Sequence, residues 1–353
     1  DHRDLHKEYR RQRQMCIRDS SWANKRERGH YKFKRIIAIE EPARAISMSV
    51  DGTDKLDHGF PHFFEITKDD DSVRFKISVV CAMVHGTNPY IYLAWEHLYS
   101  DPNLVCEVVT RTSRHEEGKR GVLPSNLFVQ LDNCWRENKN TYVEKYLEFL
   151  VERAIHTQVL ASFLPKGHTH FDCDQLASRI GEVSQHRDIK SVEALIEVLR
   201  HCYSPEPHVE FIDNVMDWKR LINPEHPKEF PVGTAMCRPM RGLCTKSLPD
   251  QDQAYYMDET SPLHWRIRAD AQGHVFLQTR HTVDTPEEQW SEPVYHWDTN
   301  APRPQGRDRA STRESGLLVS DLKIAPYRVL KDRRIGELKS ALEGVRTRLT
   351  EEE

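Results

Sequence analysis

The chain has 353 residues, of which 38% are apolar and 30% are charged, and its formal net charge is -4. This length accommodates one large domain with appendages, or two domains. The longest nearly apolar run, residues 77–84, is far shorter than the roughly 20 residues that a membrane-spanning helix requires. Residues 1–13 lack the apolar core of a secretory signal. We therefore expect a protein of the nucleus or cytoplasm that is neither secreted nor embedded in a membrane.

The spacing of the cysteines indicates the redox compartment of the protein, and the local charge indicates the kind of molecule that it binds. None of the eight cysteines forms a C-x-x-C pair, which argues against a disulfide scaffold or a zinc ribbon and fits a reducing compartment. Residues 1–35 carry 12 Lys/Arg against 5 Asp/Glu, a local net charge of +7. Such a basic arm can bind a polyanion, and a solvated charged helix is the alternative interpretation.

From about residue 43 the sequence alternates between strand and helix patterns. Strands are predicted at residues 45–50, 73–85, 90–95, 127–131 and 159–164. Helix patterns begin at Asp101-Pro102 and near Asn140, and two more follow at residues 175–180 and 192–199. Short turns join the first three strands and favour an antiparallel meander, whereas the later strand–helix–strand unit favours parallel pairing. The predicted fold class is α/β: a mixed five-stranded sheet in the order 3-2-1-4-5, built from residues 43–182 and flanked by helices, as in the ribonuclease H-like fold.

The predicted organisation has four regions. Residues 1–42 form a basic lead-in that is helical or disordered, and residues 43–204 form the core. Residues 205–297 combine a proline-rich connector with a small β-rich appendage, in which residues 264–282 read as a hairpin around Gln272-Gly273. Residues 298–353 comprise a polar linker and a C-terminal helix, indicated by the three–four spacing from Ile335 to Leu349.

Acidic residues fall at the ends of predicted strands and at a helix start. Asp51 ends the first strand and Asp132 the fourth, and Asp172 or Asp174 opens the helix after the fifth. Because the first and fourth strands are neighbours in the predicted sheet, these carboxylates would meet at one edge. Carboxylates held this close select Mg²⁺ or Mn²⁺ ions, which neutralise them. Each aspartate alone can also be explained as a turn former or a helix cap.

Polar side chains surround these acidic positions. They are Asn133, Asn138, Lys139 and Asn140 after Asp132, and His168 and His170 before Asp172. One interpretation is contact with a phosphate backbone, and the other is an ordinary solvated or hydrogen-bonded loop.

Two other chemistries use the same residue types. His168 and His170 with Cys173 and Asp174 allow a zinc site, which needs a distant further ligand such as Cys134. A Cys–His hydrolase would pair Cys134 or Cys173 with His168, but the sequence supplies neither a nucleophile elbow nor an oxyanion loop.

Three segments carry a family resemblance: SMSVDGTDK, LFVQLDNCWRENKN and FLPKGHTHFDCDQLASRI. In this order they resemble a family of uncharacterised, transposon-derived eukaryotic proteins whose domain of unknown function looks like a ribonuclease H-like DDE/D transposase core. The resemblance covers about residues 40–182. It implies a catalytic, metal-binding triad of Asp51, Asp132 and Asp174, with Asp172 as a further candidate ligand. Phe171 departs from the pattern, which has an acidic residue there.

The resemblance implies a metal-dependent DNA transposase or nuclease. Water and then a freed 3′-hydroxyl would attack phosphodiesters with two Mg²⁺ or Mn²⁺ ions, while His168, His170 and Lys139 contact phosphate. DNA would be the partner, no small-molecule cofactor is expected, and a homo-oligomer is compatible with the resemblance. The alternative is a catalytically silent, domesticated transposase that binds nucleic acid or protein, and an unrelated hydrolase on a similar sheet is a third interpretation.

Overall fold

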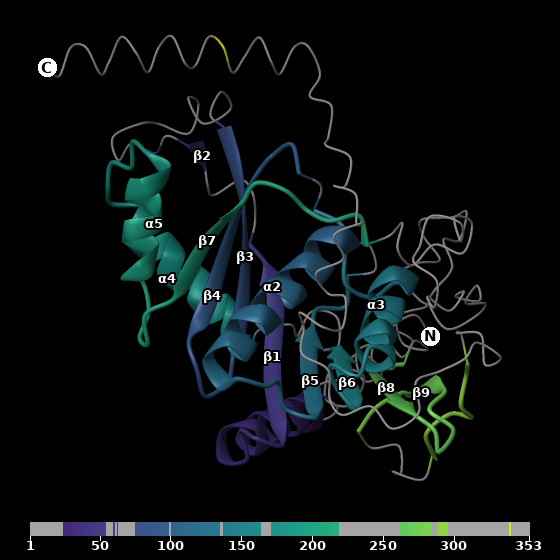
Figure 1. Ribbon diagram of the computed structural model, residues 1–353. Helices are drawn as coiled ribbons and strands as arrows, with labels where there is room; N and C mark the ends of the chain where they lie inside the picture. The colour runs from purple at the N-terminus through teal and green to yellow at the C-terminus, as the bar shows by residue number, and fades with distance from the viewer. Residues whose placement is uncertain are drawn as a thin grey trace, which may run out of the picture.

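The centre of the protein is a mixed β-sheet, seen in a computed structural model that describes residues 24–53, 59–60, 62, 75–98, 100–134, 137–163, 171–218, 262–283, 289–295 and 339. Its main strand order is β7-β4-β3-β1-β5-β6-β8-β9 (Figure 1). The strands are β1 (Ala45–Gly52), β3 (Phe75–Val84), β4 (Pro89–Trp95), β5 (Asn126–Leu131), β6 (Gln158–Phe163), β7 (His208–Ile212), β8 (His264–Ala269) and β9 (Val275–Arg280). A short strand, β2 (Gly59–Phe60), pairs with β3.

The five strands predicted within residues 43–182 are confirmed in the predicted order. β1 pairs antiparallel with β3 and parallel with β5, so that residues 45–49 lie beside residues 126–130. β3 pairs antiparallel with β4, and β5 pairs parallel with β6. The α/β class with a mixed sheet is therefore as predicted.

The sheet extends beyond these five strands at both edges, which corrects the predicted strand number. β7 pairs parallel with β4, and the β8–β9 hairpin pairs antiparallel with β6. The hairpin was predicted, and Gly273 in its turn has a φ of +85°, which glycine adopts at little cost. Its place in the sheet was not predicted, because pairing across about a hundred residues leaves no periodic signal in the sequence.

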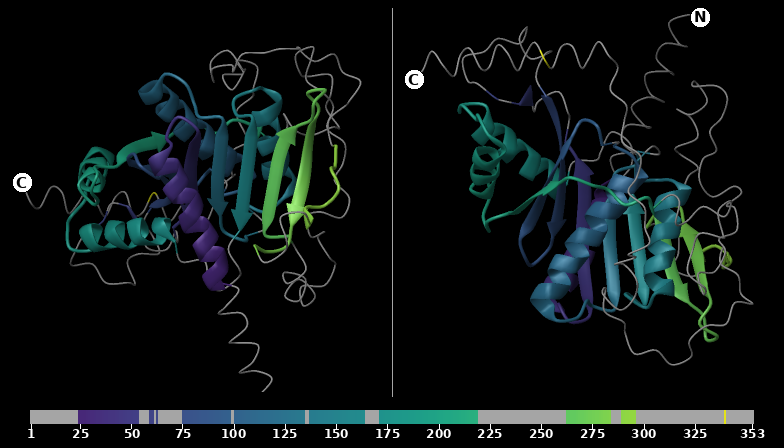
Figure 2. Two further views of the ribbon diagram at one scale, coloured as in Figure 1. Left: turned by 90° about the horizontal axis from the view of Figure 1, so that it is seen from below. Right: turned by 45° about the horizontal axis from the view of Figure 1, so that its top comes forward.

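Helices cover both faces of the sheet, as the two views of Figure 2 show. They are the helix of residues 24–40, α2 (Pro102–Arg120), α3 (Thr141–Glu152), α4 (Asp172–Ser184) and α5 (Val192–Arg200). α2 and α3 pack on one face, whereas α4 and the helix of residues 24–40 lie on the other, and α5 packs against α4 and β7. Among the helices that the structure describes, none is both long and apolar enough to span a bilayer.

Local capping signals place the helix starts as predicted. The Asp101 carboxylate accepts a hydrogen bond from the backbone N–H of Asn103 at 2.9 Å, directly before Pro102 at the first turn of α2. The Asn140 side chain accepts hydrogen bonds from Tyr142 and Val143 at 3.0 and 3.1 Å and thereby caps α3. In each helix the capping side chain and the N–H groups that it binds lie within three residues of one another. The helix starts could therefore be predicted from the local sequence.

The side chains of β1 point alternately toward the two helical layers that cover the sheet. Ile46, Met48 and Val50 are buried in the core beneath α2 and α3. The intervening residues face the other layer, where Ser49 lies 3.4 Å from the thiol of Cys173 on α4. Since side chains alternate along a strand, Asp51 points to the same side as Ser49.

The lead-in is a docked helix from residue 24 onward. Lys34 is buried, and its Nζ donates a 2.7 Å hydrogen bond to Ser162 of β6. Glu27 is also buried, and its carboxylate lies 2.8 Å from His264 Nε2 of β8. Residues 1–23, the polar linker and all but Lys339 of the predicted C-terminal helix lie outside the described residues.

Candidate functional site

Asp51 and Asp132 lie at the same edge of the sheet. The parallel ladder between β1 and β5 pairs Ser49 with Gln130, and each strand reaches an aspartate two residues later. Asp51 is the penultimate residue of β1, and Asp132 directly follows the last residue of β5. The predicted proximity of the two aspartates therefore follows from the register of neighbouring strands.

Asp174 reaches this edge from the start of α4. Its carboxylate accepts a 2.7 Å hydrogen bond from the backbone N–H of Phe171 and so closes the first turn of the helix. Phe171, the departure from the family pattern, is buried and packs edge-on against Tyr31, with ring centroids 6.5 Å apart. Asp174 thus also has the helix-capping role that the sequence allowed.

The three aspartates interact electrostatically. Burial, followed by the negative charges of Asp132 and Asp174, raises the pKa of Asp51 from 3.8 to about 7. Glu137 adds a smaller contribution of the same sign. Without a cation, Asp51 is therefore partly protonated near neutral pH.

A pocket of about 290 Å³ opens beside Asp51. Its walls come from the end of β1, from β3, from the first turn of α2 and from the loop after β5; they include Thr53, Ser78, Asp101, Glu137 and Asn138. Polar and acidic groups are thus concentrated where β1 and β5 end.

The loop after β5 holds Asp132 in place. Asp132 Oδ1 accepts hydrogen bonds from the backbone N–H of Cys134, at 3.0 Å, and from the side-chain amide of Asn138. The loop closes on itself, because the backbone N–H groups of Asn138 and Lys139 both donate to the carbonyl of Cys134. Both hydrogen bonds are accepted by Oδ1, and none of the described residues of this loop donates one to Oδ2 of Asp132.

Most polar residues predicted to bind phosphate in this loop make contacts within the protein, and their contact with a nucleic acid stays a prediction. Lys139 is only 4% exposed, and its Nζ lies over the ring of Phe163 at 5.0 Å. Asn138 is equally buried and binds Asp132, and Asn140 caps α3. Asn133 is half-buried beside Asp132, and its contact with a nucleic acid stays a prediction.

Asp172 belongs to a different cluster, so its predicted role as a metal ligand is not supported. Its Oδ2 receives hydrogen bonds from Tyr31, at 3.1 Å, and Arg35, at 2.9 Å, and lies 3.0 Å from His85 Nε2. Burial alone would raise the pKa of Asp172, but the hydrogen bond to His85 and the charge of Arg35 outweigh it and lower the pKa. This carboxylate joins α4 to the helix of residues 24–40.

The alternatives that use Cys173 as a nucleophile or a zinc ligand receive little support, whereas those that use Cys134 stay untested. Cys173 is buried, its thiol contacts the carbonyls of Ser49 and Cys81 at 3.4 and 3.6 Å, and burial raises its pKa well above the usual value. A thiol in this state is a poor nucleophile and a poor metal ligand. His168 and His170 lie outside the described residues, so their predicted contacts with phosphate stay predictions.

A tighter group of candidate ligands lies elsewhere. Within the described part of the chain, one set of three His, Cys, Asp or Glu side chains has all its ligand atoms within 4.8 Å of one another: His115, His208 and Glu210. The aspartates at the strand ends form a looser group. The sequence analysis missed this set, although His208-x-Glu210 places two ligands on one face of a strand.

Comparison with known proteins shows similarity to one family over part of the chain. Residues 67–230 are similar to a family described as "Domain of unknown function (DUF7869)". The match runs from before β3 to beyond β7 and includes Asp132 and Asp174, while Asp51 lies outside it. No curated protein and no solved structure matches the chain.

Proposed function

We propose that this chain is a transposon-derived, ribonuclease H-like core that cleaves or transfers DNA strands with Mg²⁺ or Mn²⁺. The observation that carries the proposal is the convergence of Asp51, Asp132 and Asp174, close enough for two of these charges to raise the pKa of the third. Acidic groups are concentrated in this way at sites that bind divalent cations.

The order of the elements supports the same proposal. A first strand, flanked by an antiparallel second and a parallel fourth strand, carries one aspartate at its end, and the fourth strand carries another. The helix after the fifth strand brings the third aspartate. This is the arrangement that the resemblance to DDE/D transposases implies.

The donor set fits hard divalent ions. The candidate ligands that the structure describes at this edge are carboxylates, and Mg²⁺ and Mn²⁺ prefer carboxylate oxygens together with water and phosphate. When bound, such ions activate water and stabilise the charge that develops on a phosphodiester. Asp51, Asp132 and Asp174 would hold them.

The chain itself supplies positioned ligands and a place for the substrate. Hydrogen bonds from Cys134 and Asn138 orient Asp132, and the helix cap orients Asp174. Ordered ligands bind with less loss of conformational entropy. The pocket is lined by Asp51, one of the three aspartates, and offers space for a phosphate group beside this carboxylate.

A catalytically silent DNA-binding or protein-binding module is the second candidate. It is favoured by the internal hydrogen bonds of Asp132 and Asp174 and by the looser spacing of the three carboxylates compared with the group at His115. In that case the same edge would bind without cleaving.

Cleavage of end-labelled duplex and single-stranded DNA, with Mg²⁺, Mn²⁺ or a chelator, tests the proposal. We expect cleavage only with metal and a loss of cleavage in Asp132→Asn. Asp213→Asn is the matched control, because Asp213 directly follows β7 as Asp132 follows β5, but at an exposed position. Metal-independent cleavage, or none in the wild-type protein, would remove the enzymatic proposal, and DNA binding without cleavage would favour the silent module.

A further inference from the structure

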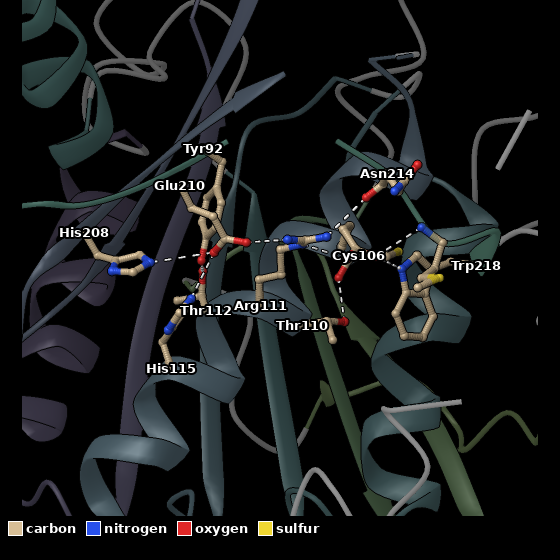
Figure 3. Close-up of polar contacts among 12 residues, drawn as sticks. Tyr92, Cys106, Thr110, Arg111, Thr112, His115, His208, Glu210, Asn214 and Trp218 are labelled. Carbon is tan, nitrogen blue, oxygen red and sulfur yellow. Dashed lines mark hydrogen bonds and ion pairs between the residues drawn. The ribbon is translucent and has the colours of Figure 1, made fainter. Parts of the chain in front are cut away.

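Two histidines and a glutamate meet between α2 and the edge strand β7 (Figure 3). His115 comes from α2, and His208 and Glu210 come from β7. The two β7 residues are separated by one position, so both side chains point from the same face of the strand toward α2. Three potential ligands are thus contributed by two elements that lie about a hundred residues apart in the sequence.

The ligand atoms have a spacing that suits one small ion. Glu210 Oε2 lies 3.0 Å from His115 Nε2 and 3.7 Å from His208 Nε2. Ligands held tetrahedrally at about 2.0–2.2 Å from a zinc ion are about 3.3–3.6 Å apart. The observed separations fall on either side of this range, so small side-chain movements would suffice.

The carboxylate is oriented for this role by Arg111. The Arg111 guanidinium forms an ion pair with Glu210 Oε1, which leaves Oε2 directed at the two imidazoles. Arg111 is itself fixed by Glu107, through a 2.8 Å ion pair, and by the carbonyl of Asn214 at 3.2 Å. Groups that orient a ligand in this way are a regular feature of metal sites in proteins.

His208 Nε2 is the observation that points to a missing partner. This nitrogen is shielded from solvent, and its distance of 3.7 Å from Glu210 Oε2 exceeds hydrogen-bond length. The rings of His115 and His208 are only 4.1 Å apart between centroids, so two imidazolium charges would repel each other there. A single cation between neutral imidazoles would satisfy both nitrogens and the carboxylate.

We propose that His115 Nε2, His208 Nε2 and Glu210 Oε2 bind one divalent transition-metal ion, for which Zn²⁺ is the best match. Imidazole nitrogens favour zinc and its neighbours over Mg²⁺ or Ca²⁺, which take oxygen ligands. Three protein ligands leave a fourth position for water.

This site is independent of the aspartate edge. α2 begins beside the pocket at Asp101, and His115 lies fourteen residues further along the helix, about 21 Å at 1.5 Å per residue. The donor atoms also differ, because nitrogen ligands select a different class of metal from an all-carboxylate site. The zinc proposal therefore does not rest on the proposed DNA chemistry.

The bound ion would fasten the edge strand β7 to α2. A ligand that binds only the folded protein raises the free energy of unfolding. This gain grows with the logarithm of the ratio of ligand concentration to dissociation constant. We therefore expect Zn²⁺ to raise the melting temperature of the full chain, and this rise should be lost in variants of the histidine site.

Metal content and stability test the site directly. The full chain is stripped with a chelator and titrated with Zn²⁺, with calorimetry, bound-metal analysis and melting temperature as readouts. We expect His115→Ala and His208→Ala each to lose one equivalent of tightly bound zinc, with affinity at that site weakened at least about tenfold. His201→Ala is the control, because His201 forms an exposed 3.0 Å pair with Glu197 but has no third ligand within reach among the described residues.

Cobalt substitution identifies the ligands without relying on stability. Co²⁺ bound at this site should give visible d–d absorption bands without a thiolate charge-transfer band, and the bands should disappear in His208→Ala. Circular dichroism of the metal-free variants verifies that they fold. Unchanged zinc stoichiometry in both histidine variants, a thiolate band, or no zinc binding by the wild-type chain would each overturn the proposal.

Discussion

Asp51 and Asp132 occupy equivalent positions on two neighbouring parallel strands, each two residues beyond the paired residues Ser49 and Gln130. Their proximity is therefore built into the backbone hydrogen bonds of the sheet rather than into contacts between the side chains. Two like charges held by a rigid scaffold repel each other, and this repulsion contributes to the raised pKa of Asp51. A divalent cation bound between the two carboxylates would attract both of them and offset their mutual repulsion.

The first prediction concerns Asp132→Asn. The amide keeps an oxygen to accept the hydrogen bond from Cys134 but removes one negative charge beside Asp51. We expect metal-dependent cleavage to fall by at least about 10²-fold, because the cation site loses a charged ligand. Without metal, the melting temperature should be unchanged or slightly higher, since repulsion is relieved.

Thermal melts with and without Mg²⁺ check this variant. The wild-type protein should gain stability on addition of Mg²⁺, and Asp132→Asn should gain less. An equal gain in both proteins would show that Asp132 does not contribute to cation binding.

The second prediction concerns pH and Asp51. The pKa of Asp51 is raised to about 7 in the folded protein, so between its unfolded value of 3.8 and about 7 the folded state holds the proton more tightly than the unfolded state. The sign follows: without metal, stability should fall as pH rises through this interval and level off above it. Asp51→Asn should remove this contribution.

Chemical denaturation of the metal-free protein from pH 4 to 8 measures the effect as a difference between wild type and Asp51→Asn. Added Mg²⁺ should flatten the wild-type curve, because a cation favours the ionised carboxylate. Identical pH profiles for the two proteins would contradict the coupling among the aspartates.

The third prediction separates the adjacent residues Asp172 and Asp174. Asp172→Asn weakens the contacts with Tyr31, Arg35 and His85 and should lower the free energy of unfolding by about 1–3 kcal/mol. Because the pKa of Asp172 is lowered on folding, this contribution should be present above pH 3.8 and disappear as the pH falls further. Metal-dependent cleavage should survive in Asp172→Asn and be lost in Asp174→Asn. The opposite pattern in urea melts and cleavage assays would exchange their roles.

The fourth prediction concerns the basic helix. Residues 24–35 carry six Lys/Arg and one acidic residue, and among them Lys25 and Lys32 are exposed while Lys34 is buried. If the exposed lysines contact phosphates, each contact contributes about 0.9 to the slope of log affinity against log salt. Lys25→Gln/Lys32→Gln should then flatten that slope for DNA, as measured by fluorescence anisotropy.

Arg179→Gln/Arg200→Gln is the control for this measurement, since both arginines are exposed helix cations at other positions. An equal effect of the two double variants would mean that only overall charge matters and that the basic helix is no preferred DNA contact.

The sequence determined the features that depend on near neighbours along the chain. The alternation of Ile46, Met48 and Val50 identified β1 and its buried face, and Asp101 and Asn140 marked helix starts because a cap binds N–H groups two or three residues away. The order of strands and helices then restricted the topology to a mixed sheet with Asp51 beside Asp132.

The tertiary structure decided which residues far apart in the sequence meet at Asp172 and at His115. Asp172 and Asp174 are indistinguishable in the sequence as helix-start aspartates, but only Asp172 meets the residues that come from the helix of residues 24–40 and from the turn after β3. Likewise, His115 meets His208 and Glu210 only because β7 pairs with β4 beside α2, and such long-range pairing leaves no local pattern from which it could be predicted.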